Sequence, residues 1–384
     1  MQLDEILKKA RHLATEVLSV ESALVDKEAV WPKKSIQALL NAGLGGLVAP
    51  KETGGQGHGL YALARVAETL GEACASTSLC FGMHCVGTAV IAAKATHWQK
   101  ENYLVPISRG EHLTTLALSE PGTGAHFYYP QTQLLPLSEN EFSIKGKKSF
   151  ITNGNQADSY VISTVAVDPD ADPNLFSCIV VDRETEGLVW GPDWQGMGMR
   201  GNSSRGLDIQ SAKVSARHLL GKQGDQLWYI FNVVAPYFLT AMAGTYLGIA
   251  QAAFNEAREH LQRRSYAHSG AGLSQVHVLQ HKLGSLWAKI ERTRRLIYYA
   301  AQEGDTENFN ALPAILSAKA EVAHCAVEAV NEAMTLSGGI AYRENSRFNV
   351  LLRDARAAHI MSPTTDLLYT WLGRALLDQP ILSD

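Results

Sequence analysis

The chain has 384 residues, which at about 150 residues per domain predicts two or three folded units. Hydrophobic residues make up 46% of the chain and charged residues 19%, so the composition is that of a globular protein and excludes general disorder. The 34 Lys and Arg against 38 Asp and Glu give a net charge of −4, without a basic stripe. We therefore expect no nucleic-acid partner.

Cysteine usage and the N-terminus bear on the compartment. The odd count of five cysteines, without a C-x-x-C pair, predicts neither a disulfide framework nor a zinc site, so a cytoplasmic protein is the default expectation. The N-terminus is charged and amphipathic, unlike an ordinary signal peptide. The uncharged stretch 226–255 contains Asn232 and Pro236, and we interpret it as a buried helix rather than a membrane span.

The first part of the chain is predicted to be helical. Apolar residues recur every three or four positions from Leu3 to Leu18, and similar patterns continue to about Ile107. The glycine-dense segment 50–59 interrupts them, and its composition indicates a tight turn or a wall that another backbone approaches closely.

The middle of the chain changes to short β-rich runs between turn residues. These runs are 113–118, 142–151, 160–167, 175–181 and 207–214. Because no helix-length apolar stripe separates them, an antiparallel sandwich or barrel is favoured over parallel βαβ units.

Helical periodicity returns from about Asp225. Long stripes occupy 242–261, 276–297 and 322–336, and a last helix is predicted to begin near Pro363, a residue suited to the first helical position. Four such helices predict a bundle. The fold class is therefore α+β, with an N-terminal helical domain at 1–111, a β domain at 112–220 and a helical bundle at 221–384.

Several familiar motifs fit poorly. Residues 196–201 match the letters G-x-G-x-x-G, but a loop-like segment follows instead of a helix, so we interpret them as a turn rather than a dinucleotide site. His277 and His281 have metal-ligand spacing without a third ligand, which favours solvated side chains. No nucleophile elbow or P-loop occurs.

Three other segments suit a bound cofactor. Residues 118–125 end a strand in a turn rich in hydroxyl groups and free N–H groups, and 150–154 end another with an aromatic ring and a hydroxyl. Gly338 and Gly339 end a helix where a backbone can approach a phosphate. Each segment alone is ordinary turn chemistry.

Taken in order, these segments resemble the acyl-CoA dehydrogenase family along essentially the whole chain. Ser119-Glu120-Pro121-Gly122-Thr123-Gly124 is similar to the family's Thr-Glu-Pro-Gly-x-Gly, and 150–154 to its Trp-Ile-Thr-Asn-Gly. Residues 263–266 resemble Arg-x-x-Phe, and 353–356 resemble the closing Arg-Asp-Ala element. The resemblance implies FAD held between the β domain and the bundle, with a neighbouring subunit contributing.

The resemblance also implies which residues meet the cofactor. The expected FAD-binding residues are Leu118, Ser119, Gly124, Ala125, Phe150, Ile151, Thr152, Arg263, Ser265, Gly338, Gly339, Thr364 and Asp366. Because Arg263 and the two glycines act on a neighbour's cofactor in the family, we expect a homo-oligomer, either a dimer or a tetramer.

The substrate positions depart from the family pattern. The family's catalytic glutamate falls on Ser362, and the alternative glutamate position on the first bundle helix falls on Phe238. A serine hydroxyl has no accessible basic form near neutral pH. His84 and His126 are candidate bases, Asp366 is a third, and Phe238, His84 and Ser362 are candidate substrate contacts.

Three functions follow from the resemblance. The first is an FAD-dependent oxidoreductase of fatty acid metabolism that oxidises an acyl-CoA-like substrate by hydride transfer to flavin N5, with a protein electron acceptor or oxygen. The second is a flavin monooxygenase or oxidase on the same fold, favoured by the missing glutamate. The third is a relative that binds flavin or acyl-CoA without turnover.

Overall fold

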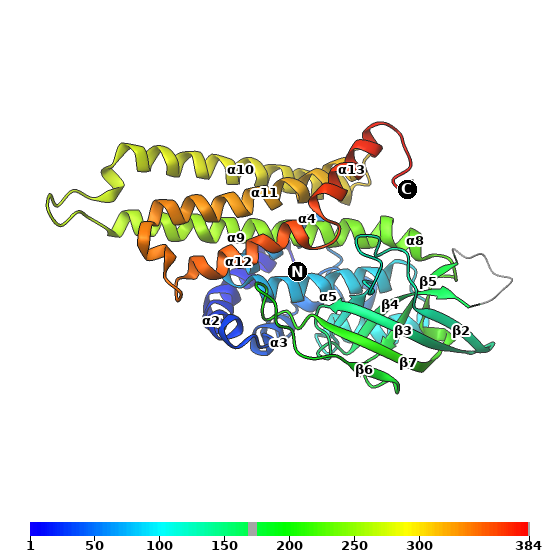
Figure 1. Ribbon diagram of the computed structural model, residues 1–384. Coiled ribbons are helices and arrows are strands. Elements are labelled where there is room, and N and C mark those ends of the chain that lie inside the picture. Colours follow the sequence, from blue (N-terminus) through cyan, green and yellow to red (C-terminus); the bar gives the residue numbers. More distant parts are fainter. Residues whose placement is uncertain (168–174, 383–384) are drawn as a thin grey trace.

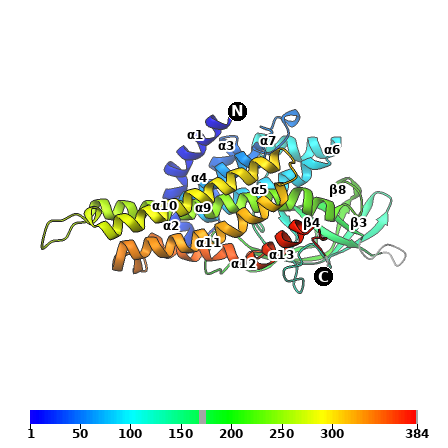
Figure 2. The same cartoon turned by 90° about the horizontal axis from the view of Figure 1, so that it is seen from above.

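The computed structural model of the protein describes residues 1–167 and 175–382. Two groups of helices, from the start and the end of the chain, pack against each other and against a sheet built from the middle (Figure 1). The predicted fold class and element order are confirmed. Seen from above, the long C-terminal helices extend well beyond the sheet on one side (Figure 2).

The N-terminal part is helical, as the periodicity predicts. Its helices are α1 (Leu3–Leu13), α2 (Ser19–Glu28), α3 (Lys33–Asn41), α4 (Leu60–Ala73), α5 (Ala75–Ala93), α6 (His97–Gln99) and α7 (Val105–Arg109). The glycine-dense segment 50–59 folds back on residues 46–49, and a Cβ at Gly55 would lie 2.2 Å from the carbonyl oxygen of Ala49. The predicted close backbone approach is therefore present.

The middle part forms one eight-stranded sheet. Its strands are β1 (Thr114–Ala117), β2 (Gln133–Ser138), β3 (Glu141–Ile151), β4 (Ser159–Ala166), β5 (Phe176–Asp182), β6 (Leu188–Trp190), β7 (Arg205–Ser215) and β8 (Leu219–Leu220). The order is β6-β7-β3-β2-β4-β5-β8, with β1 paired to β4.

The expectation of a purely antiparallel sheet is wrong at two pairs. Both β1 and β2 run parallel to β4, and all other pairs are antiparallel. The sequence periodicity of single strands carries no information on direction, and a long turn followed by a hairpin lets β1 and β2 reach β4 without a crossover helix.

The C-terminal part contains three long helices, α9 (Ala235–Arg263), α10 (His277–Asp305) and α11 (Ala311–Ser337), and two shorter ones, α12 (Arg347–Ile360) and α13 (Thr365–Leu376). The sequence stripes predict all of these except α12. The last helix begins at Thr365, close to the predicted start near Pro363, and the Thr364 side chain caps it by accepting a hydrogen bond from the N–H of Leu367.

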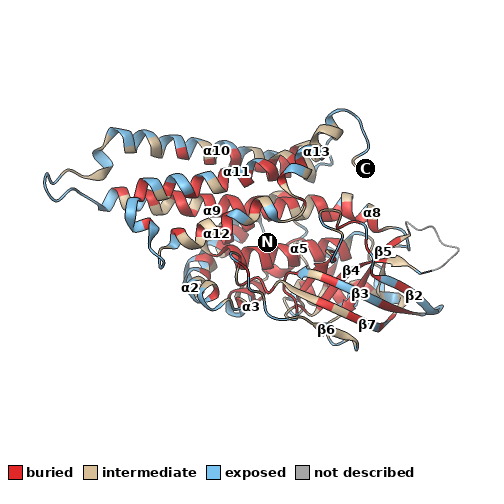
Figure 3. Ribbon diagram, viewed as in Figure 1, coloured by how far each residue is buried: buried red, intermediate tan, exposed pale blue. Residues whose placement is uncertain are grey.

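The buried hydrophobic residues form one cluster with members from both helical parts and the sheet, and buried positions run along the facing sides of these parts (Figure 3). Helix α5 and the segment 226–263 are long and apolar enough to cross a membrane. However, 94% of the most apolar stretch of α5 and 83% of that of 226–263 are buried inside the protein. The interpretation of 226–255 as a buried helical segment therefore holds, with a short helix α8 (Gln226–Tyr229) at its start. All five cysteines are buried and free.

Candidate functional site

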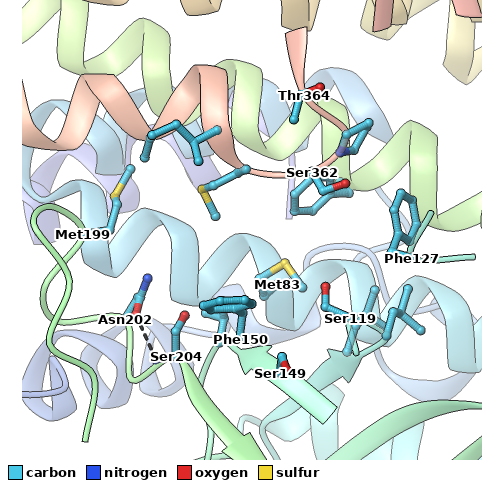
Figure 4. A pocket seen from close by; sticks show the side chains of 18 of the residues that line it. Met83, Ser119, Phe127, Ser149, Phe150, Met199, Asn202, Ser204, Ser362 and Thr364 are labelled. Carbon is cyan, nitrogen blue, oxygen red and sulfur yellow. Dashed lines mark hydrogen bonds between the residues drawn. The ribbon is translucent and has the colours of Figure 1, made fainter. Parts of the chain in front are cut away.

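A large cavity lies between the sheet, α5 and the C-terminal helices. Its volume is about 670 Å³, within the range of cofactor pockets in general. The ends of β1 and β3 form one wall, and the segment 360–364 after α12 lies opposite (Figure 4). The cavity therefore collects residues from every part of the chain.

Phe150 reaches this cavity because strand β3 is irregular at its end. Between the pairs Lys148–Leu207 and Ile151–Arg205 strand β3 carries one residue more than β7, which is a β-bulge. Phe150 has a φ of +54°, rare for a bulky residue, and its side chain is 69% exposed. Its ring meets Trp194 edge to face at 6.3 Å. The bulge thus directs an aromatic ring into the cavity at the cost of local strain.

The turn 119–125 is fixed by a buried ion pair. The Glu120 carboxylate forms an ion pair with the Lys148 ammonium. It also accepts hydrogen bonds from the backbone N–H groups of Gln131 and Thr132 and from the Thr132 hydroxyl. Lys148 in turn donates to both oxygens of Ser163, and its burial lowers the pKa to about 8. All of the oxygen atoms of Glu120 are thus committed to holding the turn.

Beyond Glu120 the same turn presents open backbone. Gly122 and Gly124 have positive φ, and a Cβ at either would meet nothing within 4 Å. Within the described residues, the N–H groups of Gly122, Gly124 and Ala125 have no hydrogen-bond acceptor. Such free N–H groups on a turn suit anionic oxygen atoms.

The loop 196–204 forms a third wall. The Asp354 carboxylate on α12 accepts the N–H of Met199 at 2.6 Å, and Arg353 beside it donates to the carbonyl of Met197 while forming a two-pronged ion pair with Asp26 on α2. Met199 and Ser203 both have positive φ. The interpretation of 196–201 as a turn holds, because no helix follows it, but the turn lines the cavity.

The segment 362–364, part of the wall opposite β1 and β3, is fixed by a buried lysine. Lys319 on α11 is fully buried and donates to the carbonyls of Ala358 and Pro363, and its burial lowers the pKa to about 8. Ser362 donates to the carbonyl of Ala125 at 3.4 Å, which links this wall to the turn 119–125. The Lys319 ammonium lies near the C-terminus of α12, where the helix dipole favours a positive charge.

The cavity carries little available charge. Among the described residues that line it, Glu120 and Arg353 are the charged ones, and both are committed to the contacts above. The indole N–H of Trp194 is buried at the cavity and has no partner within the described chain. The site therefore offers apolar surface, hydroxyls and backbone N–H groups, but no free carboxylate.

Many of the sequence-predicted site residues come together here. The cavity is lined by Leu118, Ser119, Gly124, Ala125, Phe150, Thr152, Phe238, Ser362 and Thr364. Ile151 is buried directly behind the wall, and Asp366 is exposed on the first turn of α13. Sequence reasoning did not find Met83, Trp194 or Asn202, which carry no motif, and it interpreted the segment that contains Met199 as a plain turn.

The two candidate histidines lie off the cavity wall. His84 is fully buried, one ring nitrogen contacts the carbonyl of Gly45 and the other accepts the N–H of Thr114. Burial lowers its pKa to about 4. These contacts disfavour His84 as a base or substrate contact. His126 follows the wall residue Ala125 and its Nδ1 lies 2.9 Å from the Tyr128 hydroxyl.

Four predicted residues lie away from the cavity. Arg263, Ser265, Gly338 and Gly339 are exposed where α9 and α11 end, at the end of the bundle remote from the sheet (Figure 1). Arg263 pairs with Glu259 one turn earlier. Within one chain these residues are not brought to the cavity. The paired histidines His277 and His281 are exposed, and no metal-ligating cluster occurs in the described residues.

Comparison with known families identifies the family of the chain. Residues 2–111, 115–212 and 240–377 match the N-terminal, middle and C-terminal domains of acyl-CoA dehydrogenase, in that order. The chain belongs to the acyl-CoA dehydrogenase family. The predicted class, an acyl-CoA dehydrogenase-like oxidoreductase, is thereby confirmed.

Individual members of the acyl-CoA dehydrogenase family are similar along almost the full length. Cyclohex-1-ene-1-carbonyl-CoA dehydrogenase of Geobacter metallireducens is 28% identical over 375 residues, covering 97% of each chain. The short-chain-specific acyl-CoA dehydrogenase of Clostridium acetobutylicum is 27% identical and covers 94% of each. The structure of butyryl-CoA dehydrogenase from Megasphaera elsdenii superposes with a TM-score of 0.91 at 26% identity, covering 98% of each chain.

Removing Lys148 should expose how much the turn 119–125 depends on the buried pair. Lys148→Met leaves the Glu120 carboxylate buried without its counter-charge, so we expect a loss of about 3–5 kcal/mol in unfolding free energy, measured by urea denaturation. Adding Glu120→Gln should restore part of it. Lys147→Met, at the neighbouring exposed lysine, should change stability by less than about 0.5 kcal/mol. Equal losses at the two lysines would contradict this account.

Asp354 should make stability depend on pH. Burial raises its pKa from 3.8 to about 7. Between these values the folded state keeps a proton that the unfolded state releases, so its contribution to stability falls as pH rises from about 4 to 7. The measurement is the difference in unfolding free energy between the native protein and the Asp354→Asn variant. We expect the native protein's advantage over the variant to be smaller at pH 7.5 than at pH 4.5. A difference independent of pH would refute the assignment.

Proposed function

We propose that the protein is an FAD-dependent oxidoreductase that oxidises an acyl-CoA-like substrate. The observation that carries the proposal is the convergence of the turn 119–125, the bulged end of β3 and the segment 362–364 on one cavity. FAD, when bound there, supplies a hydride acceptor. The names of the relatives, which act on cyclohex-1-ene-1-carbonyl-CoA and butyryl-CoA, support a thioester substrate.

The residues present fit such a cofactor. The cavity is large and mainly apolar, Phe150 offers a ring, and Thr152 closes the wall beside it. The free N–H groups of Gly122 and Gly124 offer donors to negatively charged oxygen atoms. The unpartnered indole N–H of Trp194 offers one more donor at the same cavity. In the proposed role these groups bind and orient the cofactor and keep water away from it.

We further propose that this chain lacks the family's catalytic carboxylate. Ser362 occupies the position where the resemblance places the glutamate, and the one lining carboxylate, Glu120, is held by Lys148. A positioned base contributes about 10²- to 10⁴-fold to proton removal. His126 lies in sequence between the lining residues Ala125 and Phe127 and is our candidate acceptor of the proton, although its ring contacts the Tyr128 hydroxyl instead of lining the cavity.

The same absence favours a second candidate, a flavin monooxygenase or oxidase on this fold. In a monooxygenase a separate reductase would supply the two electrons of the reduced flavin, and oxygen would take them up, with one oxygen atom entering the substrate and the other leaving as water. Removal of a thioester α-proton by a carboxylate is then not needed. The electron acceptor is then oxygen itself rather than a protein.

Anaerobic mixing with butyryl-CoA or cyclohex-1-ene-1-carbonyl-CoA tests the dehydrogenase. We expect slow bleaching of the flavin absorbance, and Ser362→Glu should accelerate it at least about tenfold because it supplies the missing base. Ser362→Gln, of similar size without the charge, is the matched control and should not.

Three results would separate the alternatives. No bleaching by either thioester, in native protein or in Ser362→Glu, would reject the dehydrogenase. Rapid reoxidation of chemically reduced protein by air, with a hydroxylated product, would favour the monooxygenase. A flavin that is neither bleached nor rapidly reoxidised would indicate a binding protein without turnover.

We also propose a homo-oligomer, a dimer or tetramer, in which exposed Arg263 reaches the neighbouring subunit's FAD. Arg263→Ala should then weaken FAD retention by about 1.5–3 kcal/mol, through loss of a charge-assisted hydrogen bond. Equilibrium dialysis measures the affinity, and Arg264→Ala, the adjacent exposed arginine, is the control. Unchanged FAD affinity in Arg263→Ala, or a monomer with full FAD occupancy, would contradict the proposal.

A further inference from the structure

A second cavity lies where the N-terminal helices meet the sheet. Its volume is about 380 Å³, and it shares no lining residue with the cavity described above. Its walls come from α6, the segment 102–103, His112 before β1, the start of β4, the end of β5, and the turn at His218. Because these elements are far apart in sequence, the cavity exists only in the folded chain.

Four aromatic rings line this cavity. The centroid of Trp98 lies 5.9 Å from that of Tyr103 and 5.0 Å from that of His218, and Tyr103 lies 5.6 Å from His112. Burial lowers the pKa of both histidines, against the opposing effect of the nearby carboxylates Asp158 and Asp182. The four rings form an aromatic cluster on one side of the cavity.

Carboxylates occupy the remaining wall. Asp158, Asp182 and Glu184 line it together with a single cation, Arg183. Arg183 is paired with Glu184 at 3.0 Å and lies 3.7 Å from Asp158. Three negative charges against one positive charge leave the cavity with an excess of negative charge, and Asp182 has no cationic partner among the described residues.

The aromatic cluster is held in place by its own hydrogen bonds. The Tyr103 hydroxyl donates to Asp182 at 3.0 Å and lies 2.7 Å from Nδ1 of His218. His112 contacts the Ser159 hydroxyl, and Asp158 accepts the N–H of Leu113. Binding would therefore require little ordering of these side chains, which favours affinity.

This combination excludes most other ligand classes. A phosphate or carboxylate would face three like charges. For a metal ion, no group of three or more ligating side chains converges anywhere in the described chain. An organic ammonium ion suits both walls, because aromatic rings attract a weakly hydrated cation and a carboxylate neutralises it.

We propose that the cavity lined by Trp98, Tyr103, His112, His218 and Asp182 binds a small organic ammonium ion, separately from the flavin chemistry. The site holds the charged group between the rings and Asp182, and the open side toward Glu184 admits it. A substrate amine or an osmolyte would share this chemistry.

Choline and its uncharged carbon analogue, 3,3-dimethylbutan-1-ol, test the proposal on the full-length protein. NMR titration should give a Kd for choline below about 10 mM at low salt, with the analogue at least about fivefold weaker because it lacks the charge. Asp182→Asn, which retains an acceptor for Tyr103, should weaken choline binding at least about fivefold. Glu186→Gln, which removes a carboxylate outside the lining, should leave it unchanged.

Trp98→Leu provides a second variant should Asp182→Asn disturb folding, and it too should weaken choline binding. Equal binding of choline and its analogue would overturn the proposal, as would choline affinity unchanged in both variants or absent up to about 50 mM. The flavin absorbance of the same samples reports on the main cavity independently, so failure here and failure of the proposed function are distinguishable.

Discussion

The buried pair between Glu120 and Lys148 is the interaction on which the candidate site depends. It joins the turn after β1 to the interior face of β3, so the turn 119–125 and the bulge at Phe150 have a fixed relation. A buried ion pair contributes little net stability, because desolvation offsets the attraction. Here the pair fixes the position of the turn, since the Glu120 carboxylate also accepts hydrogen bonds from the N–H groups of Gln131 and Thr132, where the turn rejoins the sheet.

Two other parts of the cavity lining are held by polar side chains on α11 and α12. Asp354 and Arg353 on α12 hold the loop 196–204, and Lys319 on α11 holds the backbone of Pro363. These contacts hold residues such as Met199 in left-handed conformations that a free loop would leave. Phe150 and Met199, which both line the cavity, thus have strained backbone conformations, as expected where a site is shaped in advance of its ligand.

The sequence predicted much of this architecture, and its failures have physical causes. Helical stripes such as 242–261 predicted the long helices because one face of each is buried. Helix α12 is half as long, and its buried face of Phe348, Leu351, Ala355 and Ala358 also holds the charged residue Asp354, so it was not predicted. The parallel pairing of β1 with β4 could not be predicted, because strand periodicity does not encode direction. His84 was a candidate base, yet it is sealed in the core by Gly45 and Thr114. Trp194 has no motif and reaches the site only through the ion pair between Asp193 and Arg205 and the Phe150 bulge.

The central claim is that these walls enclose FAD. The most direct measurement is the flavin content of the protein purified under native conditions, from the absorbance spectrum and from chromatography of the cofactor released by denaturation. The account predicts a yellow protein that carries, or takes up on incubation, about one FAD per chain, with little free flavin fluorescence because aromatic side chains contact the ring. A colourless protein that binds no added FAD would contradict it.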